Sequence, residues 1–378
     1  MANSVALPCK YPSFKDLTFG VEYEFLAHID ATKMSKEEKE ALDPASQPPR
    51  HVVHLISQAV GEDLKKCGLR DGVEITDMLL PGFGDKDDKA WIIKSDQSVT
   101  PNDPDGSPEK ASSPISHFAG LEITTPVMPN NTRAFSEILE VSKALVRHPH
   151  VSFNDTCGLH VHVGNADEGF TLLTCQKLFV LLFLGGEAVL NTLFREDRHT
   201  NKHCVDIRTH TGVADNLDVK HYLTGTVPDE WYNACFPSGP PVDQDDQRER
   251  DIIKVIWKAA SIDEFMDCLN AENLAYSWEH LASDAFNPTK TIEFRKAEGN
   301  LRKPMNAEFV YDWVQVCMGL VAFAVDADPE EFGKVIKETV TASRHSMSLL
   351  MVHRFLSNFG LDRDVLRRMV DRANVLED

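Results

Sequence analysis

One short segment near the middle of the chain, Gly158-Leu-His-Val-His-Val-Gly164, constrains the fold more than any other. Side chains alternate between the two faces of a β-strand, so His160 and His162 are expected on one face, with the aliphatic residues between them in an apolar layer. Two neutral imidazoles held side by side suit a metal or polyphosphate site. The alternative is the polar outer face of a half-buried sheet, where histidine is an ordinary surface residue.

Three further strand-like segments carry charged residues on one face and apolar residues on the other. Parallel carboxylates repel one another unless a cation or water lies between them, and carboxylate sets favour hard ions such as Mg²⁺ or Mn²⁺. The guanidinium of an arginine beside them can donate two parallel hydrogen bonds to a phosphate or carboxylate group. The residues are Glu22 and Glu24 in segment 19–26, Glu122 in segment 119–126, and Glu293 and Arg295 in segment 290–295.

Composition limits the class of protein. The chain has 378 residues with 42% hydrophobic content, enough for a substantial core, and we predict one catalytic domain over 1–378 with a helical C-terminal portion from 305 to 378. The 59 acidic residues against 39 basic ones give a formal charge of −20. This charge disfavours nucleic acid and anionic membrane as partners.

Cysteine usage and the N-terminus predict a cytoplasmic protein. The eight cysteines show no Cys-x-x-Cys pair, so we expect reduced thiols rather than a disulfide framework or zinc knuckle. The first 14 residues contain no continuous apolar run, so no secretory signal is expected. The apolar stretch 178–186 is too short to span a bilayer, which needs about 20 residues, and is predicted to be a buried helix.

Between the strands, hydrophobic periodicity predicts helices, and clusters of polar residues, proline and glycine predict loops. The predicted helices are 51–67, 133–147, 172–194, 306–325, 329–359 and 362–375, and the predicted loops are 102–113 and 236–248. No Gly-x-x-x-x-Gly-Lys-Ser/Thr or strand-following Gly-x-Gly-x-x-Gly motif occurs, which argues against P-loop and dinucleotide-binding folds.

Taken in order, these motifs resemble the amidoligase family, a branch of the glutamine synthetase and glutamate–cysteine ligase superfamily of ATP-dependent carboxylate–amine ligases. The chain departs from the family pattern at Gly299-Asn-Leu301, where a threonine commonly follows the glycine, and in segments 31–93 and 101–118, which are longer than a minimal member needs. The matching residues, within a core of about 19–301, are Gly20-Val-Glu22-Tyr-Glu24, Lys94-Ser-Asp96-Gln-Ser98, Gly120-Leu-Glu122, Thr125-Pro126, Cys157–Gly164, Arg198 with Asn201 and Cys204, and Thr291-Ile-Glu293-Phe-Arg295.

The resemblance implies an α+β fold, with a glutamine synthetase-like curved antiparallel sheet backed by helices and a helical C-terminal portion. It also implies roles for individual residues. The implied metal ligands are Glu22, Glu24, Glu122, His160 and Glu293. The implied catalytic and nucleotide-binding residues are Arg295 as the phosphate clamp, Arg198, Glu293, His162 and Asn201, and the implied substrate-side residues are Asp96 and Ser98.

The predicted activity is ATP-dependent formation of an amide from a small, amino-acid-like acid and an amine through an acyl phosphate, with ATP and Mg²⁺ or Mn²⁺ as cofactors. Two alternatives stay open. A metal-dependent amide hydrolase also uses His-x-His motifs, although it gives Glu-x-Arg no role. A nucleotide-binding relic of the fold would keep the side chains without turnover. A Cys157–His160 hydrolase is disfavoured, because an odd spacing on a strand places the two on opposite faces.

Overall fold

The computed structural model describes residues 9–30, 60–62, 64, 73–75, 90–100, 116–166, 168–215, 223–236, 241, 243–270, 273–282, 289–301, 307–344 and 348–377. These residues form two compact units, each built from separate stretches of chain. The first unit comprises the described residues of Gly20–Val161 and Ala297–Tyr311. The second comprises those of Val5–Phe19, His162–Lys296 and Asp312–Asp378.

The first unit is built on a mostly antiparallel sheet with the strand order β2-β3-β4-β1-β7. Strand β4 pairs antiparallel with both β1 and β3, β6 pairs antiparallel with β1, and the short β2 pairs parallel with β3. The strands with residues here are β1 (Thr18–Asp30), β2 (Val73–Ile75), β3 (Trp91–Ser95), β4 (Ser116–Thr124), β5 (Met128–Pro129), β6 (Val151–Ser152), β7 (Gly158–Gly164) and the end of β9 (Thr291–Glu298).

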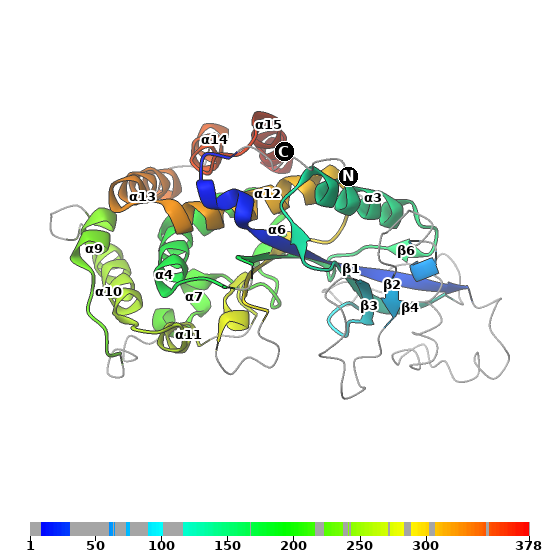
Figure 1. Ribbon diagram of the computed structural model, residues 1–378, viewed down its shortest axis with the longest axis horizontal. Helices are drawn as coiled ribbons and strands as arrows, with labels where there is room; N and C mark the ends of the chain where they lie inside the picture. The colour runs from blue at the N-terminus through cyan, green and yellow to red at the C-terminus, as the bar shows by residue number, and fades with distance from the viewer. Residues whose placement is uncertain are drawn as a thin grey trace. The chain divides into compact units, whose positions relative to one another are not determined.

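Helix α3 (Thr132–Arg147) covers the apolar face of this sheet (Figure 1). The Tyr23 hydroxyl on β1 donates to the Ile138 carbonyl at 3.2 Å, and the Trp91 indole on β3 donates to Glu137 at 2.9 Å. Both aromatic side chains are buried. Because strand side chains alternate, residues one position along from Tyr23 on β1 must lie on the opposite face. That face carries the carboxylates discussed below.

The second unit is mainly helical around an aromatic core. Phe179, Phe265 and Trp278 meet with ring centroids 5.6–6.1 Å apart. Its strands are the end of β7, β9 and β8 (Tyr276–Ser277), in the order β7-β9-β8. Its helices are α4 (Leu172–Leu181), α5 (Glu187–Asn191), α6 (Glu196–His199), α7 (Ile207–His210), α8 (Gly212–Asp215), α9 (Asp229–Cys235), α10 (Gln244–Lys258), α11 (Ile262–Leu269), α12 (Ala307–Asp326, entering from the first unit), α13 (Pro329–Arg344), α14 (Leu349–Ser357) and α15 (Arg363–Glu377), with 3₁₀ turns at Pro12–Asp16 and Glu279–Leu281.

The predicted buried helix at 172–194 is confirmed. Helices α4 and α5 are joined by a π-helical turn, Leu182–Gly186, in which Gly185 has a φ of 137°. The run Leu172–Asn191 and helix α12 are each long and apolar enough to cross a membrane, but 83% of the most apolar window of each is buried within the structure. Burial of this kind is typical of the core helices of a folded domain.

Other helix predictions divide into confirmed and corrected ones. Those at 133–147, 306–325 and 362–375 are confirmed by α3, α12 and α15. The single helix predicted for 329–359 is wrong, because Ser348 has an extended backbone and precedes a second helix, α14, that begins at Leu349. The predicted loop 236–248 is wrong over its last five residues, because the Asp243 side chain accepts from the Asp246 amide and caps α10.

Two predictions lie outside the described residues: the loop at 102–113, and all but four residues of the helix at 51–67. The α+β class, the largely antiparallel sheet, its helical backing and the helical C-terminal part are confirmed. Likeness to the glutamine synthetase sheet stays a prediction, as does a single catalytic domain. All seven cysteines among the described residues are free thiols.

Candidate functional site

A row of charged side chains crosses three strands of the first unit, on the face opposite α3. The antiparallel register places Glu24 of β1 opposite Glu122 of β4, and Glu122 opposite Lys94 of β3. Both glutamates are buried, with 5% and 7% of their surface exposed. The Lys94 ammonium lies 2.8 Å from Glu122 Oε1. Two buried carboxyl groups therefore face each other across the strands, and the lysine contacts only Glu122.

His160 of β7 joins the two carboxylates of β1. Its Nδ1 lies 3.1 Å from Glu22 Oε2 and its Nε2 lies 3.3 Å from Glu24 Oε1. The Gly158 amide donates to the other oxygen of Glu24. A Cβ atom at position 158 would stand 2.8 Å from His160 Nε2 and 3.0 Å from Glu24 Oε2, so a side chain here would displace these two groups.

Asp96, just beyond the end of β3, completes an oxygen-rich group. Its Oδ1 accepts from both the amide and the hydroxyl of Ser98 at 2.7 Å, which fixes the carboxylate. Asp96, Glu24 and Glu122 each offer an oxygen, and these oxygens lie within 4.8 Å of one another. A hard divalent cation prefers such ligands, so the residues present fit Mg²⁺ or Mn²⁺.

The charges in this group perturb one another. Burial, followed by the neighbouring Glu22 carboxylate, raises the pKa of Glu122 above its ordinary value in spite of Lys94. Burial alone would lower the pKa of Lys94, but the carboxylates of Glu122 and Glu22 outweigh it and the pKa is raised. A cation placed among these carboxylates would relieve their repulsion. Perturbed ionisable groups gathered on one face are typical of a functional site.

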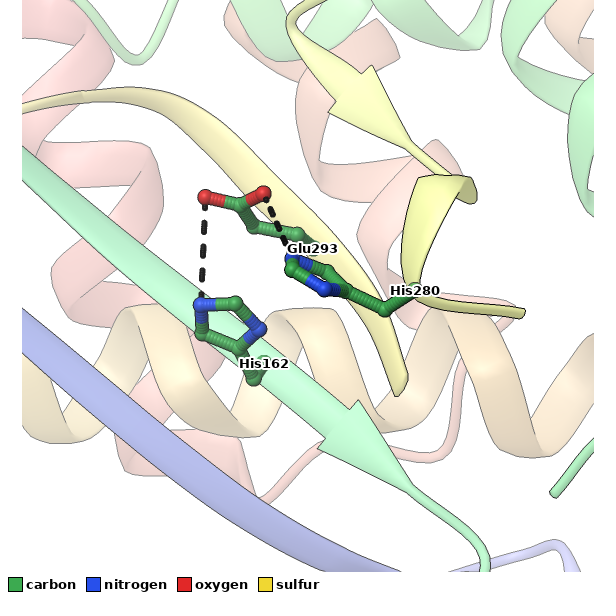
Figure 2. Close-up of side chains that lie close together, drawn as sticks. All are labelled: His162, His280 and Glu293. Atoms are coloured by element: carbon green, nitrogen blue, oxygen red, sulfur yellow. Dashed lines mark ion pairs between the residues drawn. The ribbon is translucent and has the colours of Figure 1, made fainter. Parts of the chain in front are cut away.

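The second unit contains a group of two imidazoles and a carboxylate, shown in Figure 2. His162 Nε2 lies 3.8 Å from Glu293 Oε1, and His280 Nε2 lies 3.5 Å from Glu293 Oε2. His162 comes from the end of β7, Glu293 from β9, and His280 from the 3₁₀ turn Glu279–Leu281. Glu293 is buried, while the two imidazoles are partly exposed.

Arg295 lies on the same face of β9 as Glu293, as its spacing predicts. Its Nη1 donates to both oxygens of Glu293, at 3.1 and 3.2 Å. Arg295 also lines a cavity of about 310 Å³ together with Asn273, Ser277 and Glu279. A guanidinium at the wall of a polar cavity can donate a fork of hydrogen bonds to phosphoryl oxygens.

Arg198 and Asn201 both contact backbone groups of the second unit. Arg198 is buried, and its guanidinium donates to the carbonyls of Arg295 at 2.9 Å and Lys296 at 3.3 Å. Asn201 Oδ1 accepts from the His203 amide at 2.8 Å. Through these contacts Arg198 holds the backbone of β9 at Arg295 and Lys296. A nucleotide contact of either residue stays a prediction.

Sequence reasoning gave no role to two residues that the structure places in these groups. Lys94 occurs in the Lys-Ser-Asp motif, but its approach to Glu122 depends on the pairing of β3 with β4. His280 sits alone in a 3₁₀ turn and has no periodic neighbour to mark it. The remaining predicted residues divide by unit: Glu22, Glu24, Asp96, Ser98, Glu122 and His160 belong to the first, and His162, Arg198, Asn201, Glu293 and Arg295 to the second.

A family model described as "Putative amidoligase enzyme" matches residues 15–221. The matched segment contains every predicted site residue of the first unit, as well as His162, Arg198 and Asn201 of the second, and it ends before His280, Glu293 and Arg295. A search of curated proteins found no match.

Proposed function

We propose that this chain, which belongs to the amidoligase family, is an ATP-dependent carboxylate–amine ligase. Family membership indicates a ligase that forms amide bonds, and the proposal adds the ATP requirement and the acyl-phosphate route. The observation that carries the proposal is the carboxylate group of the first unit. Glu24, Asp96 and Glu122 bring oxygens within 4.8 Å of one another on one face of a sheet.

Burying such a group of carboxylates lowers the free energy of unfolding, which favours a functional role for the group. Burying carboxylates side by side opposes folding through desolvation and mutual repulsion, and a single lysine offsets only part of the charge. Glu24, Asp96 and Glu122, with Glu22 and His160 beside them, would hold Mg²⁺ or Mn²⁺. When bound, such ions neutralise the charge of a triphosphate and make its γ-phosphorus open to attack.

The reaction would proceed in two displacements. A carboxylate oxygen of the acid attacks the γ-phosphorus of ATP, the bond to the β-phosphate oxygen breaks, and ADP leaves behind an acyl phosphate. The amine then attacks the acyl carbon, loses a proton, and displaces inorganic phosphate to give the amide. We assign Arg295 to the equatorial phosphoryl oxygens, where its planar fork would stabilise charge during the first displacement.

The proposed substrates are a small, amino-acid-like carboxylic acid and an amine, by analogy with the superfamily. The formal charge of −20 disfavours nucleic acid and anionic membranes as partners. We further propose that the protein acts in the cytoplasm, because its cysteines are suited to a reducing compartment.

A metal-dependent amide hydrolase is the second candidate, and the His162–His280–Glu293 group favours it. Two histidines and one glutamate are the protein ligands of several catalytic zinc sites, in which an open position holds the attacking water. Arg295 would have no part in that chemistry. The two candidates therefore differ in whether ATP is consumed.

One assay separates the candidates. Purified protein with Mg²⁺ is incubated with a panel of amino acids, with and without added amines, and ADP and amide are measured. The ligase proposal predicts ADP and amide in equal amounts, and only when ATP, an acid and an amine are all present. Release of acid from an amide without ATP would instead identify the hydrolase. Nucleotide binding with no turnover on any substrate would indicate a relic of the fold.

A further inference from the structure

We propose that His162, His280 and Glu293 form a binding site for a transition-metal ion of the zinc class. This site would be chemically distinct from the hard-cation group proposed for the first unit. It goes beyond the proposed ligase function, and its evidence lies entirely within the second unit. Figure 2 shows both imidazoles turned toward the Glu293 carboxylate.

The separations between the side chains fit a shared ion better than direct hydrogen bonds. Nitrogen and oxygen ligands lie about 2.0–2.1 Å from zinc, so two ligands of a tetrahedral ion stand roughly 3.3–3.4 Å apart. His162 Nε2 lies 3.8 Å from Glu293 Oε1 and His280 Nε2 lies 3.5 Å from Glu293 Oε2, each just above that value. Hydrogen bonds from ring nitrogens to carboxylates are usually about 2.7–3.2 Å long. All three ligand atoms lie within 4.8 Å of one another, so small side-chain movements would bring them to coordination distance from one ion.

The donor types select the kind of ion. Imidazole nitrogen suits Zn²⁺, Co²⁺, Ni²⁺ and Cu²⁺, whereas Mg²⁺ takes oxygen ligands and keeps much of its water. The carboxylates of Glu24, Asp96 and Glu122 form an all-oxygen set, while His162, His280 and Glu293 form a set with two nitrogens. Three protein ligands leave a fourth position for water or a substrate oxygen.

Neighbouring residues orient the ligands. His162 Nδ1 lies 3.2 Å from the Thr291 hydroxyl, which in turn lies 2.9 Å from the Thr289 hydroxyl. This contact leaves Nε2 as the nitrogen that faces Glu293. The His280 carbonyl accepts from the Lys290 amide at 3.2 Å and ties the 3₁₀ turn to the start of β9. Partners of this kind fix the tautomer and the ring angle of metal-binding histidines.

Arg295 lowers the affinity of this site for a metal ion, because its guanidinium donates to both oxygens of Glu293. An ion at the site must share that carboxylate with a positive charge. We therefore expect binding weaker than at a structural zinc site, together with sensitivity to anything that draws Arg295 away from Glu293. A phosphoryl group would do so.

Cobalt titration tests the site directly. Protein is stripped with a chelator, dialysed and titrated with Co²⁺, whose visible absorption reports nitrogen and oxygen ligands in a low-coordinate geometry. We expect saturable absorption that Zn²⁺ abolishes. His280→Ala, His162→Ala and Glu293→Gln should each weaken Co²⁺ binding at least about tenfold, and Thr291→Val should weaken it less. His210→Ala, which removes an exposed imidazole from α7, is the matched control and should leave binding unchanged.

Absorption that is unchanged in correctly folded His280→Ala, judged by circular dichroism, would overturn the inference, as would the lack of any Co²⁺ absorption in wild type. The result is independent of the ligase proposal. A cobalt signal that depends on His280, in a protein that never forms ADP, would support this site and contradict the ligase. ADP formation combined with cobalt binding that does not depend on His280 would do the reverse.

Discussion

Buried charged residues in this protein differ in what satisfies them, and that difference separates structural roles from functional ones. Glu187 accepts the Ile207 amide at 3.1 Å, and the Lys177 ammonium donates to the Ala327 carbonyl at 2.9 Å. These charges are satisfied by backbone groups, as expected of structural residues. Glu24 accepts the Gly158 amide but also meets His160, and Glu122 meets Lys94. Contacts among ionisable side chains are the arrangement expected at a site that binds ions.

Arg295 gives the sharpest prediction at the scale of one residue. Arg295→Lys keeps the positive charge but removes the planar fork, so stabilisation of the phosphoryl group should fall as its charge grows. We expect turnover to fall by about 10²–10³-fold with a smaller change in ATP affinity, measured by ADP release and by calorimetry. Arg133→Lys, at an exposed position of α3, is the control.

If Arg295 serves only to pair with Glu293, the result will differ. Arg295→Lys would then lower the melting temperature modestly and leave the rate of ADP formation near that of wild type. That outcome would remove the phosphate-clamp assignment while leaving the carboxylate group of the first unit in place.

Lys177 gives a prediction about pH. Burial lowers the pKa of Lys177 to about 8, although Asp326, Asp328 and Glu331 oppose the shift. Between about pH 8 and the ordinary lysine value near 10.4, the unfolded chain holds a proton that the folded chain has lost. The free energy of unfolding of wild type, relative to Lys177→Met, should therefore rise with pH across this window. The slope should approach about 1.4 kcal/mol per pH unit.

Below pH 8 both states carry the Lys177 proton, so the cost of burying the charge is fully present and the difference between the two proteins should be flat. Denaturant unfolding of wild type and Lys177→Met from pH 6 to 10 measures this. A difference that stays constant from pH 8 to 10 would show that the Lys177 pKa is not lowered.

At the scale of elements, the site depends on a sheet whose other face is covered by α3. Asn131 caps this helix, because its side chain accepts from the amides of Arg133 and Ala134 at 3.1 and 3.0 Å. Asn131→Ala should lower the free energy of unfolding by about 0.5–2 kcal/mol, measured by urea denaturation. Asn131→Asp retains the acceptor and should be close to wild type. Equal losses in both variants would contradict the capping role.

Period-two alternation made the faces of the strands predictable. It placed Glu22 and Glu24 opposite Tyr23, and Glu293 with Arg295, because the direction of a strand side chain is a local property. The register Glu24↔Glu122 is a long-range property, since it pairs strands whose facing residues lie far apart in sequence. The resemblance to a family brought these segments together, but the contact of Lys94 with Glu122 required the pairing itself.

Other features were beyond the sequence for different reasons. His280 lies in a 3₁₀ turn, where no periodicity distinguishes a ligand from a surface histidine. The helix interruption at Ser348 was missed because the sequence around it contains neither glycine nor proline. The beginning of α10 was missed because Asp243-Gln-Asp-Asp reads as a polar loop, although the same residues supply an N-cap and an acidic first turn.

For the whole molecule, net charge and chemistry impose a requirement on the substrate. A chain with a formal charge of −20 repels a triphosphate at long range, so ATP should bind as a complex with a divalent ion. The family match covers the carboxylate group of the first unit and ends before Glu293 and Arg295. The proposal for the first unit is therefore the better supported of the two, and it is the one to test first.

Calorimetry of ATP binding tests that claim without knowledge of the acid or the amine. We predict that wild type binds ATP with Mg²⁺ or Mn²⁺ present and does not bind measurably in excess chelator. Glu24→Gln and Glu122→Gln should lose at least about tenfold in Mg·ATP affinity. Glu140→Gln, at an exposed position of α3, should match wild type. ATP binding of equal strength with and without divalent ions, or unchanged in both site variants, would contradict the account.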